Sequence, residues 1–139
     1  MVIVYLDTSV VLRMLLNHEN RWKQWGRWKK AYSSALLYLE CRRAFDRCRL
    51  ESIFDDLHVA HAGDELRRLQ RVVGRIALTR AVVDRASQPM PTLVKTLDAI
   101  HLATALLWKD MTHADLVMAT HDAALALGAQ AHGLPVVGV

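Results

Sequence analysis

Apolar residues along this chain fall into two patterns, short continuous runs and longer stretches with helical spacing. The first run, residues 1–6, is Met-Val-Ile-Val-Tyr-Leu, and its β-branched and apolar composition predicts a strand buried on both faces. Comparable runs predict further strands at residues 76–78, 116–120 and 136–139.

Helical patterns separate these runs. Thr8 and Ser9 would supply N-cap side chains for a helix with Val10, Val11 and Met14 on one side. Ser33-Ser34 would cap a third helix at residues 35–49. Later helices are predicted at residues 63–73, 79–86 and 99–109, and from the residue after Asp122 to about residue 131. The alternation of strands and helices predicts an α/β sandwich with a parallel sheet and right-handed crossovers.

Residues 21–30 form a tryptophan-rich segment. Trp22, Trp25 and Trp28 recur at intervals of three residues, which predicts one face of an amphipathic second helix. A tryptophan stripe of this kind is more often core or partner interface than a platform on which RNA bases stack.

Composition narrows the class of protein. The 139 residues are 53% hydrophobic and contain no linker-like stretch, so we expect one compact domain over residues 1–139. No stretch approaches the roughly 20 apolar residues of a membrane span, and residues 1–6 are too short for a signal peptide; we expect a cytoplasmic protein without membrane contact. Cys41 and Cys48 lie about 10 Å apart along one predicted helix, which indicates reduced thiols. The formal charge of +4 favours a polyanionic partner.

Four acidic residues are the candidate site: Asp7, Glu40, Asp98 and Asp122. Asp7 and Asp122 stand just beyond the carboxyl ends of predicted strands, where ligands of open parallel sheets bind. Two of these acids also have a structural explanation. Glu40 could pair with an arginine of its own helix, and Asp98 would be favoured by the partial positive charge at a helix N-terminus.

The other motifs exclude several kinds of site. The chain has no glycine-rich phosphate loop and no zinc-ligand spacing among its histidines and cysteines. Hard carboxylate oxygens instead favour Mg²⁺ or Mn²⁺. His101 follows Asp98 by one helical turn, but a histidine in an apolar helix is more often a satisfied core residue, so we leave it outside the catalytic set.

The ordered motifs Leu-Asp-Thr-Ser at 6–9, Ser-Ser at 33–34 with Glu40 after it, Leu-Asp-Ala-Ile-His-Leu-Ala-Thr-Ala at 97–105 and Ala-Thr-His-Asp at 119–122 resemble the PIN-domain family and, within it, VapC-type toxins of toxin–antitoxin pairs. The resemblance covers essentially the whole chain. It implies a three-layer α/β/α fold with a central parallel sheet and the activity of a Mg²⁺- or Mn²⁺-dependent endoribonuclease. The ligands and catalytic groups would be Asp7, Glu40, Asp98 and Asp122, with Thr8 and Thr120 as supporting hydroxyls.

The same resemblance implies partners. These are an RNA substrate, a cognate VapB-like antitoxin and a second copy in a homodimer. Arg42, Arg43 and Arg47 lie near Glu40 and could hold RNA phosphates, although such a charge run is usually a solvated face. Four unpaired carboxylates brought together would repel one another, and a divalent cation is the usual means of offsetting that repulsion.

The residues also allow three other functions to be considered. A PIN-type nuclease could act in RNA processing outside toxin–antitoxin systems, or a catalytically silent PIN fold could bind RNA or protein. A Mg²⁺-dependent phosphatase with Asp7 as nucleophile is disfavoured, because the haloacid dehalogenase pattern has a second Asp where this chain has Ser9.

Overall fold

The computed structural model describes residues 2–139, which form a five-stranded parallel sheet with the strand order β3-β2-β1-β4-β5. Its strands are β1 (Ile3–Leu6), β2 (Lys30–Ser34), β3 (Val73–Ile76), β4 (Leu116–Ala119) and β5 (Val136–Val137). The helices are α1 (Thr8–Leu16), α2 (Leu36–Leu50), α3 (Asp56–Leu69), α4 (Arg80–Ala86), α5 (Thr96–Thr112) and α6 (Ala123–Ala131), with a short 3₁₀ helix η1 (His18–Asn20) after α1.

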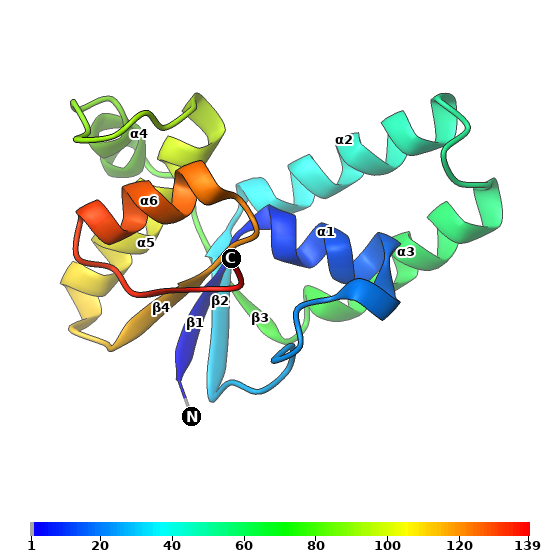
Figure 1. The fold of residues 1–139 in the computed structure, drawn as a ribbon, viewed down its shortest axis with the longest axis horizontal. Coiled ribbons are helices and arrows are strands. Elements are labelled where there is room, and N and C mark those ends of the chain that lie inside the picture. Colours follow the sequence, from blue (N-terminus) through cyan, green and yellow to red (C-terminus); the bar gives the residue numbers. More distant parts are fainter. Residues whose placement is uncertain (1) are drawn as a thin grey trace.

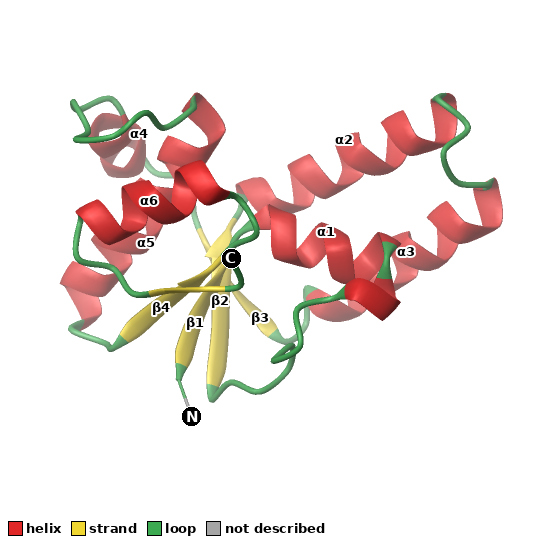
Figure 2. Ribbon diagram, viewed as in Figure 1, coloured by secondary structure: helices red, strands yellow, loops and turns green. Residues whose placement is uncertain are grey.

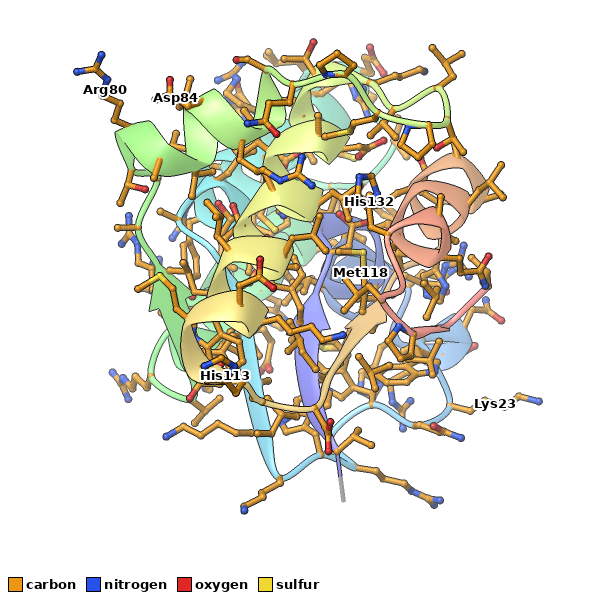
Figure 3. The ribbon with its side chains drawn as sticks, turned by 90° about the vertical axis from the view of Figure 1, so that its left-hand side faces the viewer. Lys23, Arg80, Asp84, His113, Met118 and His132 are labelled. Carbon is orange, nitrogen blue, oxygen red and sulfur yellow. The ribbon has the colours of Figure 1, made fainter. Side chains whose placement is uncertain are left out.

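Helices cover both faces of the sheet (Figures 1 and 2). Because successive strand residues point to opposite faces, Val4 and Leu6 of β1 pack with α1, α2 and α3, whereas Tyr5 packs with α5 and α6. Met118 of β4 is fully buried and lies between α5 and α6 in Figure 3. The predicted three-layer α/β/α architecture with a parallel sheet is therefore confirmed.

Most predicted elements are present with shifted boundaries. The strand predicted at residues 1–6 is observed at Ile3–Leu6, and Met1 lies outside the described residues. Asp7, rather than Thr8 or Ser9, is the N-cap of α1. The helix predicted at 63–73 begins instead at Asp56, because the Asp55 side chain accepts a hydrogen bond from the His58 backbone N–H and starts the helix there.

The prediction of a helix at residues 21–30 is wrong. Turns closed by the Trp25 and Arg27 N–H groups occupy this segment, and Gly26 has a φ of +83°, which a helix does not accommodate. The indole rings of Trp22 and Trp28 stack at 6.5 Å, and all three tryptophans pack against the core formed by α1, α2 and α3. The tryptophans recur at every third residue because their side chains pack against this core, although the backbone between them forms turns and not a helix.

The sheet contains a strand that the sequence pattern did not predict. β2 (Lys30–Ser34) pairs with both β1 and β3, at a place where only a brief connection before a helix cap was expected. Ser34 still accepts a hydrogen bond from the Leu36 N–H at the start of α2. β3 runs from Val73 to Ile76 and precedes its predicted position at 76–78, because its register is set by pairing with β2.

Two further expectations concern composition. Among residues 2–139, no helix combines the length and apolar character needed to cross a membrane. Cys41 and Cys48 are both buried and form no disulfide with each other.

Candidate active site

The four predicted acidic residues come together at the carboxyl edge of the sheet. Figure 1 shows the chain leaving β1 into α1 and leaving β4 toward α6 at this same edge. Burial, together with the negative charges of Asp7, Asp122 and Glu40, raises the pKa of Asp98 to about 6, against the lowering influence of His101. This mutual influence places all four carboxylates in one electrostatic neighbourhood.

Asp7 is fixed by hydroxyl groups. The residue is buried, with 3% of its surface exposed. Its Oδ2 atom accepts hydrogen bonds from Ser9 Oγ at 2.6 Å and Thr120 Oγ1 at 2.8 Å. The Ser9 N–H also points at Oδ2, at 3.4 Å, as expected of an N-cap. The fold therefore holds the Asp7 side chain in one orientation.

Thr120 links Asp7 to the fourth acid. Its Oγ1 accepts from the Asp122 N–H at 3.0 Å while it donates to Asp7. Asp122 itself is the N-cap of α6, and its Oδ1 accepts from the Leu125 N–H at 2.9 Å. A structural role as helix cap and a position in the acidic cluster thus coexist in Asp122.

Glu40 lies on α2 and reaches the cluster through its Oε1 atom. That oxygen accepts from Thr8 Oγ1 at 2.8 Å and lies 2.6 Å from His101 Nε2. Burial would raise the pKa of Glu40, but the hydrogen bond from His101, the positive charge of that ring and the Thr8 hydroxyl together lower it. The alternative pairing of Glu40 with Arg43 or Arg47 is not observed among residues 2–139.

His101 is both a satisfied core residue and a neighbour of the acids. Its ring is fully buried, and its Nδ1 and Nε2 atoms contact Tyr5 Oη at 2.7 Å and Thr8 Oγ1 at 3.1 Å. Burial would lower the pKa of His101, but its bond to Glu40 and the charge of Asp7 raise it. The site predicted from the sequence did not include His101, Tyr5 or Ser9. The sequence signal for His101 was its position one helical turn after Asp98. The signal for Tyr5 and Ser9 was their position two residues before and two residues after Asp7.

The expectation of four unpaired carboxylates is therefore corrected. Asp7, Glu40 and Asp122 each accept hydrogen bonds, and Glu40 also forms an ion pair with His101 when that ring is protonated. Of these four acids, only Asp98 accepts no side-chain hydrogen bond found among residues 2–139. The uncompensated charge is concentrated on that one residue.

A groove of about 660 Å³ opens beside Glu40. Arg43 and Arg47 follow Glu40 at helical spacing on α2 and line it together with apolar residues that include Leu39 and Leu97. Arg42 does not share this groove, because it projects from α2 toward Gly63 of α3. The three arginines that the sequence grouped together thus face two different surfaces.

The donor set fits Mg²⁺ or Mn²⁺ in kind. Asp7 Oδ1 and Glu40 Oε2 accept none of the hydrogen bonds found among residues 2–139, and carboxylate oxygens are the preferred ligands of these ions. Over the same residues, no three acidic, histidine or cysteine side chains form a group that could hold a metal ion by themselves. Mg²⁺ commonly binds through one or two carboxylates and retains several waters, so an open set of this kind suits it.

Fold and site define an α/β protein with a carboxylate-lined edge on a parallel sheet. The chain belongs to the PIN domain family, whose model matches residues 4–137, and the sequence-based resemblance to that family is confirmed. Domains of this family are generally nucleases that use divalent metals.

Solved structures share the fold at low sequence identity. A toxin–antitoxin complex from Klebsiella pneumoniae contains a chain that is 17% identical, with a TM-score of 0.65 over 96% of this chain and 95% of that one. VapBC2 from Rickettsia felis, bound to a DNA fragment from its promoter, is 8% identical, with a TM-score of 0.65 over 97% of each chain. No curated protein gives a significant match to the sequence.

Proposed function

We propose that this protein is a metal-dependent endoribonuclease that acts as the toxin of a type II toxin–antitoxin pair. The observation that carries the proposal is the meeting of four carboxylates at one edge of the sheet, where burial and the other three acids raise the pKa of Asp98 to about 6. Charge held together in this way is typical of sites that bind a cation or move a proton. Membership of the PIN domain family supports the same reading.

Asp7, Glu40, Asp98 and Asp122 would hold Mg²⁺ or Mn²⁺. When bound, such an ion supplies positive charge for the scissile phosphate and lowers the pKa of water. Ser9 and Thr120 keep Asp7 oriented, and Thr8 and His101 do the same for Glu40. Asp98 lacks a hydrogen-bond donor of its own within residues 2–139, so we assign to its carboxylate the acceptance of the proton from the attacking water.

The groove beside Glu40 is the proposed path of the substrate. Arg43 and Arg47 line it and would contact RNA phosphates, and the net charge of +4 favours a polyanion. Exposed Leu39 and Leu97 on the same groove would also receive an apolar segment of an antitoxin.

Similarity to solved structures supports the partner that we propose for this toxin. The toxin–antitoxin complex and the VapBC2 complex support a VapB-like antitoxin for this chain. A homodimer, a cytoplasmic location and a single PIN domain over residues 1–139 belong to the same proposal.

The test is cleavage of total cellular RNA by purified protein with Mg²⁺, with Mn²⁺ and with EDTA. Sequencing of product ends should show discrete cuts that require the metal and are absent from Asp98→Asn. Leu106→Ala, which changes a core residue on α5 away from the acids, is the matched control and should retain cleavage while folded. Folded wild-type protein, free of antitoxin, that makes no cut under any condition would contradict the proposal.

A silent PIN fold that binds RNA or protein is the second candidate. The observation that favours it is the absence, within residues 2–139, of three side chains arranged to hold a metal. Calorimetric titration with Mn²⁺ separates the two, because a silent fold would bind RNA without binding the ion. A short neighbouring reading frame for a DNA-binding antitoxin would separate the toxin from a nuclease of RNA processing.

A further inference from the structure

A buried chain of polar side chains runs from the middle of β1 to the acidic cluster. Tyr5 of β1 contacts His101 of α5, and His101 contacts Glu40 of α2. The Tyr5 and His101 rings meet edge to face, with centroids 5.8 Å apart and planes at 75°. Three separate elements of the fold therefore meet in this chain, and both rings are fully buried.

The direction of the bond between His101 and Glu40 follows from the donor inventory. A carboxylate can only accept, so the hydrogen between the two groups belongs to His101 Nε2. This holds for the neutral ring and for the doubly protonated ring alike. The Tyr5 hydroxyl, 2.7 Å from Nδ1, holds the opposite edge of the ring and fixes its rotation.

The consequence for Glu40 is an asymmetric carboxylate. Oε1 accepts hydrogen bonds from His101 Nε2 at 2.6 Å and from Thr8 Oγ1 at 2.8 Å. Oε2 receives no hydrogen bond among residues 2–139, so it is the oxygen left to coordinate a cation or a water. Groups that hydrogen-bond to metal ligands commonly set ligand orientation in this way.

We propose that His101 and Tyr5 are positioning residues that turn the Oε2 atom of Glu40 toward the bound metal. This inference rests on the proposed metal-dependent nuclease and adds to it two residues that do not touch substrate. A role in packing alone would need only ring volume, whereas the positioning role needs the Nε2 hydrogen and the Tyr5 hydroxyl.

Three variants separate these roles. His101→Leu removes the donor to Glu40, His101→Gln keeps an N–H at a similar distance along the side chain, and Tyr5→Phe keeps the ring but removes the hydroxyl. Leu106→Ala, on the same helix but outside the chain of contacts, controls for loss of core volume.

Mn²⁺ affinity by calorimetry and kcat and KM for RNA are the readouts. We expect His101→Leu to weaken Mn²⁺ binding and lower kcat by roughly 10- to 100-fold, with KM for RNA little changed. His101→Gln should recover most of both losses, and Tyr5→Phe should show a smaller loss in the same direction. Leu106→Ala should match wild type in Mn²⁺ affinity.

Equal Mn²⁺ affinity in folded His101→Gln and His101→Leu would overturn the positioning role. If His101→Leu fails to fold, Tyr5→Phe decides, because it preserves shape; wild-type Mn²⁺ affinity in that variant would overturn the role of the chain.

Nitrogen-15 NMR of the His101 ring tests the inference without metal or RNA. The wild type should show a protected hydrogen on Nε2, and rapid solvent exchange at that position would overturn the inference while leaving the nuclease proposal intact. Conversely, a protected Nε2 hydrogen and normal Mn²⁺ binding in a protein that cuts no RNA would contradict only the nuclease.

Discussion

Asp7 and Asp98 belong to the same acidic cluster but are held by opposite means. Asp7 is buried and receives hydrogen bonds from Ser9 and Thr120, so its charge is compensated by the fold. Asp98 lies in the first turn of α5 without a donor of its own in residues 2–139, and its pKa is raised to about 6. The Asp7 carboxylate stabilises the structure, whereas the Asp98 carboxylate destabilises it when ionised, and a strained group of this kind supports the catalytic role that we propose for Asp98.

The largest expected effect is on the cleavage rate, and it should be the same for Asp7 and Asp98. Both Asp7→Ala and Asp98→Ala should reduce the cleavage rate on the order of 10³-fold, since each removes several kcal/mol of metal-dependent stabilisation of the transition state. Initial rates on a defined RNA with saturating Mn²⁺ measure this. A residual rate within tenfold of wild type, about 1.4 kcal/mol, for either variant would remove that residue from the site.

Stability without metal should separate the two acids. Asp7→Ala loses a helix cap and leaves two hydroxyls without their acceptor, which we expect to cost about 1–2 kcal/mol. Asp98→Ala relieves repulsion; because Asp98 is only partly buried, screening by solvent reduces the gain to about 1 kcal/mol. Denaturant titrations in EDTA should therefore give shifts of opposite sign, and two losses of equal size would contradict the comparison.

The gain from Asp98→Ala should depend on pH. The wild type has its full stability at a pH below the pKa that Asp98 has in the unfolded chain, because the carboxyl is then protonated in both states. That stability is lost as pH rises through about 6, the raised pKa of Asp98 in the folded protein. The variant should thus be the more stable protein above pH 6, and the difference should shrink toward pH 4. A difference that is flat over this range would indicate that burial and the charges of Asp7, Asp122 and Glu40 do not act on Asp98 as described.

Thr120→Val tests the hydroxyl that joins Asp7 to Asp122. It removes a donor and an acceptor at a fully buried position, and we expect a loss of about 1–2 kcal/mol in unfolding free energy. Cleavage should fall by about tenfold because Asp7 loses one of its two hydroxyl donors. Thr112→Val is the control, since the Thr112 hydroxyl donates to the Trp108 carbonyl of its own helix, away from the acids. Similar rates for the two variants would contradict the role of Thr120.

The smallest expected effect concerns the arginines. Arg47→Ala should raise KM for RNA several-fold and reduce the slope of log affinity against log salt by about 1, because Arg47 lines the groove beside Glu40. Arg49→Ala is the matched variant on α2, and its side chain pairs with Asp46 away from that groove. Equal salt slopes for the two variants would place the RNA elsewhere.

The sequence was informative wherever a local pattern and its meaning coincide. An apolar run followed by Asp7, and another followed by Thr120 and Asp122, placed acids at strand ends, and parallel strands necessarily bring those ends to one edge. Helix α5 and the place of Asp98 in its first turn were similarly readable from apolar spacing. The fold class and the position of Asp7 and Asp122 at one edge of the sheet could therefore be predicted from the pattern, whereas the meeting of all four acids was implied only by the resemblance to the PIN-domain family.

Only tertiary structure decided how the charges are compensated and what the ambiguous segments become. Local spacing could not show that Tyr5, Glu40 and His101 meet, because they come from three elements far apart in the chain. Nor could it distinguish a helix from turns in the tryptophan segment, where burial against α1, α2 and α3 determines the spacing. The strand β2 exists because neighbours on both sides satisfy its backbone hydrogen bonds, a condition that no pattern within residues 30–34 records.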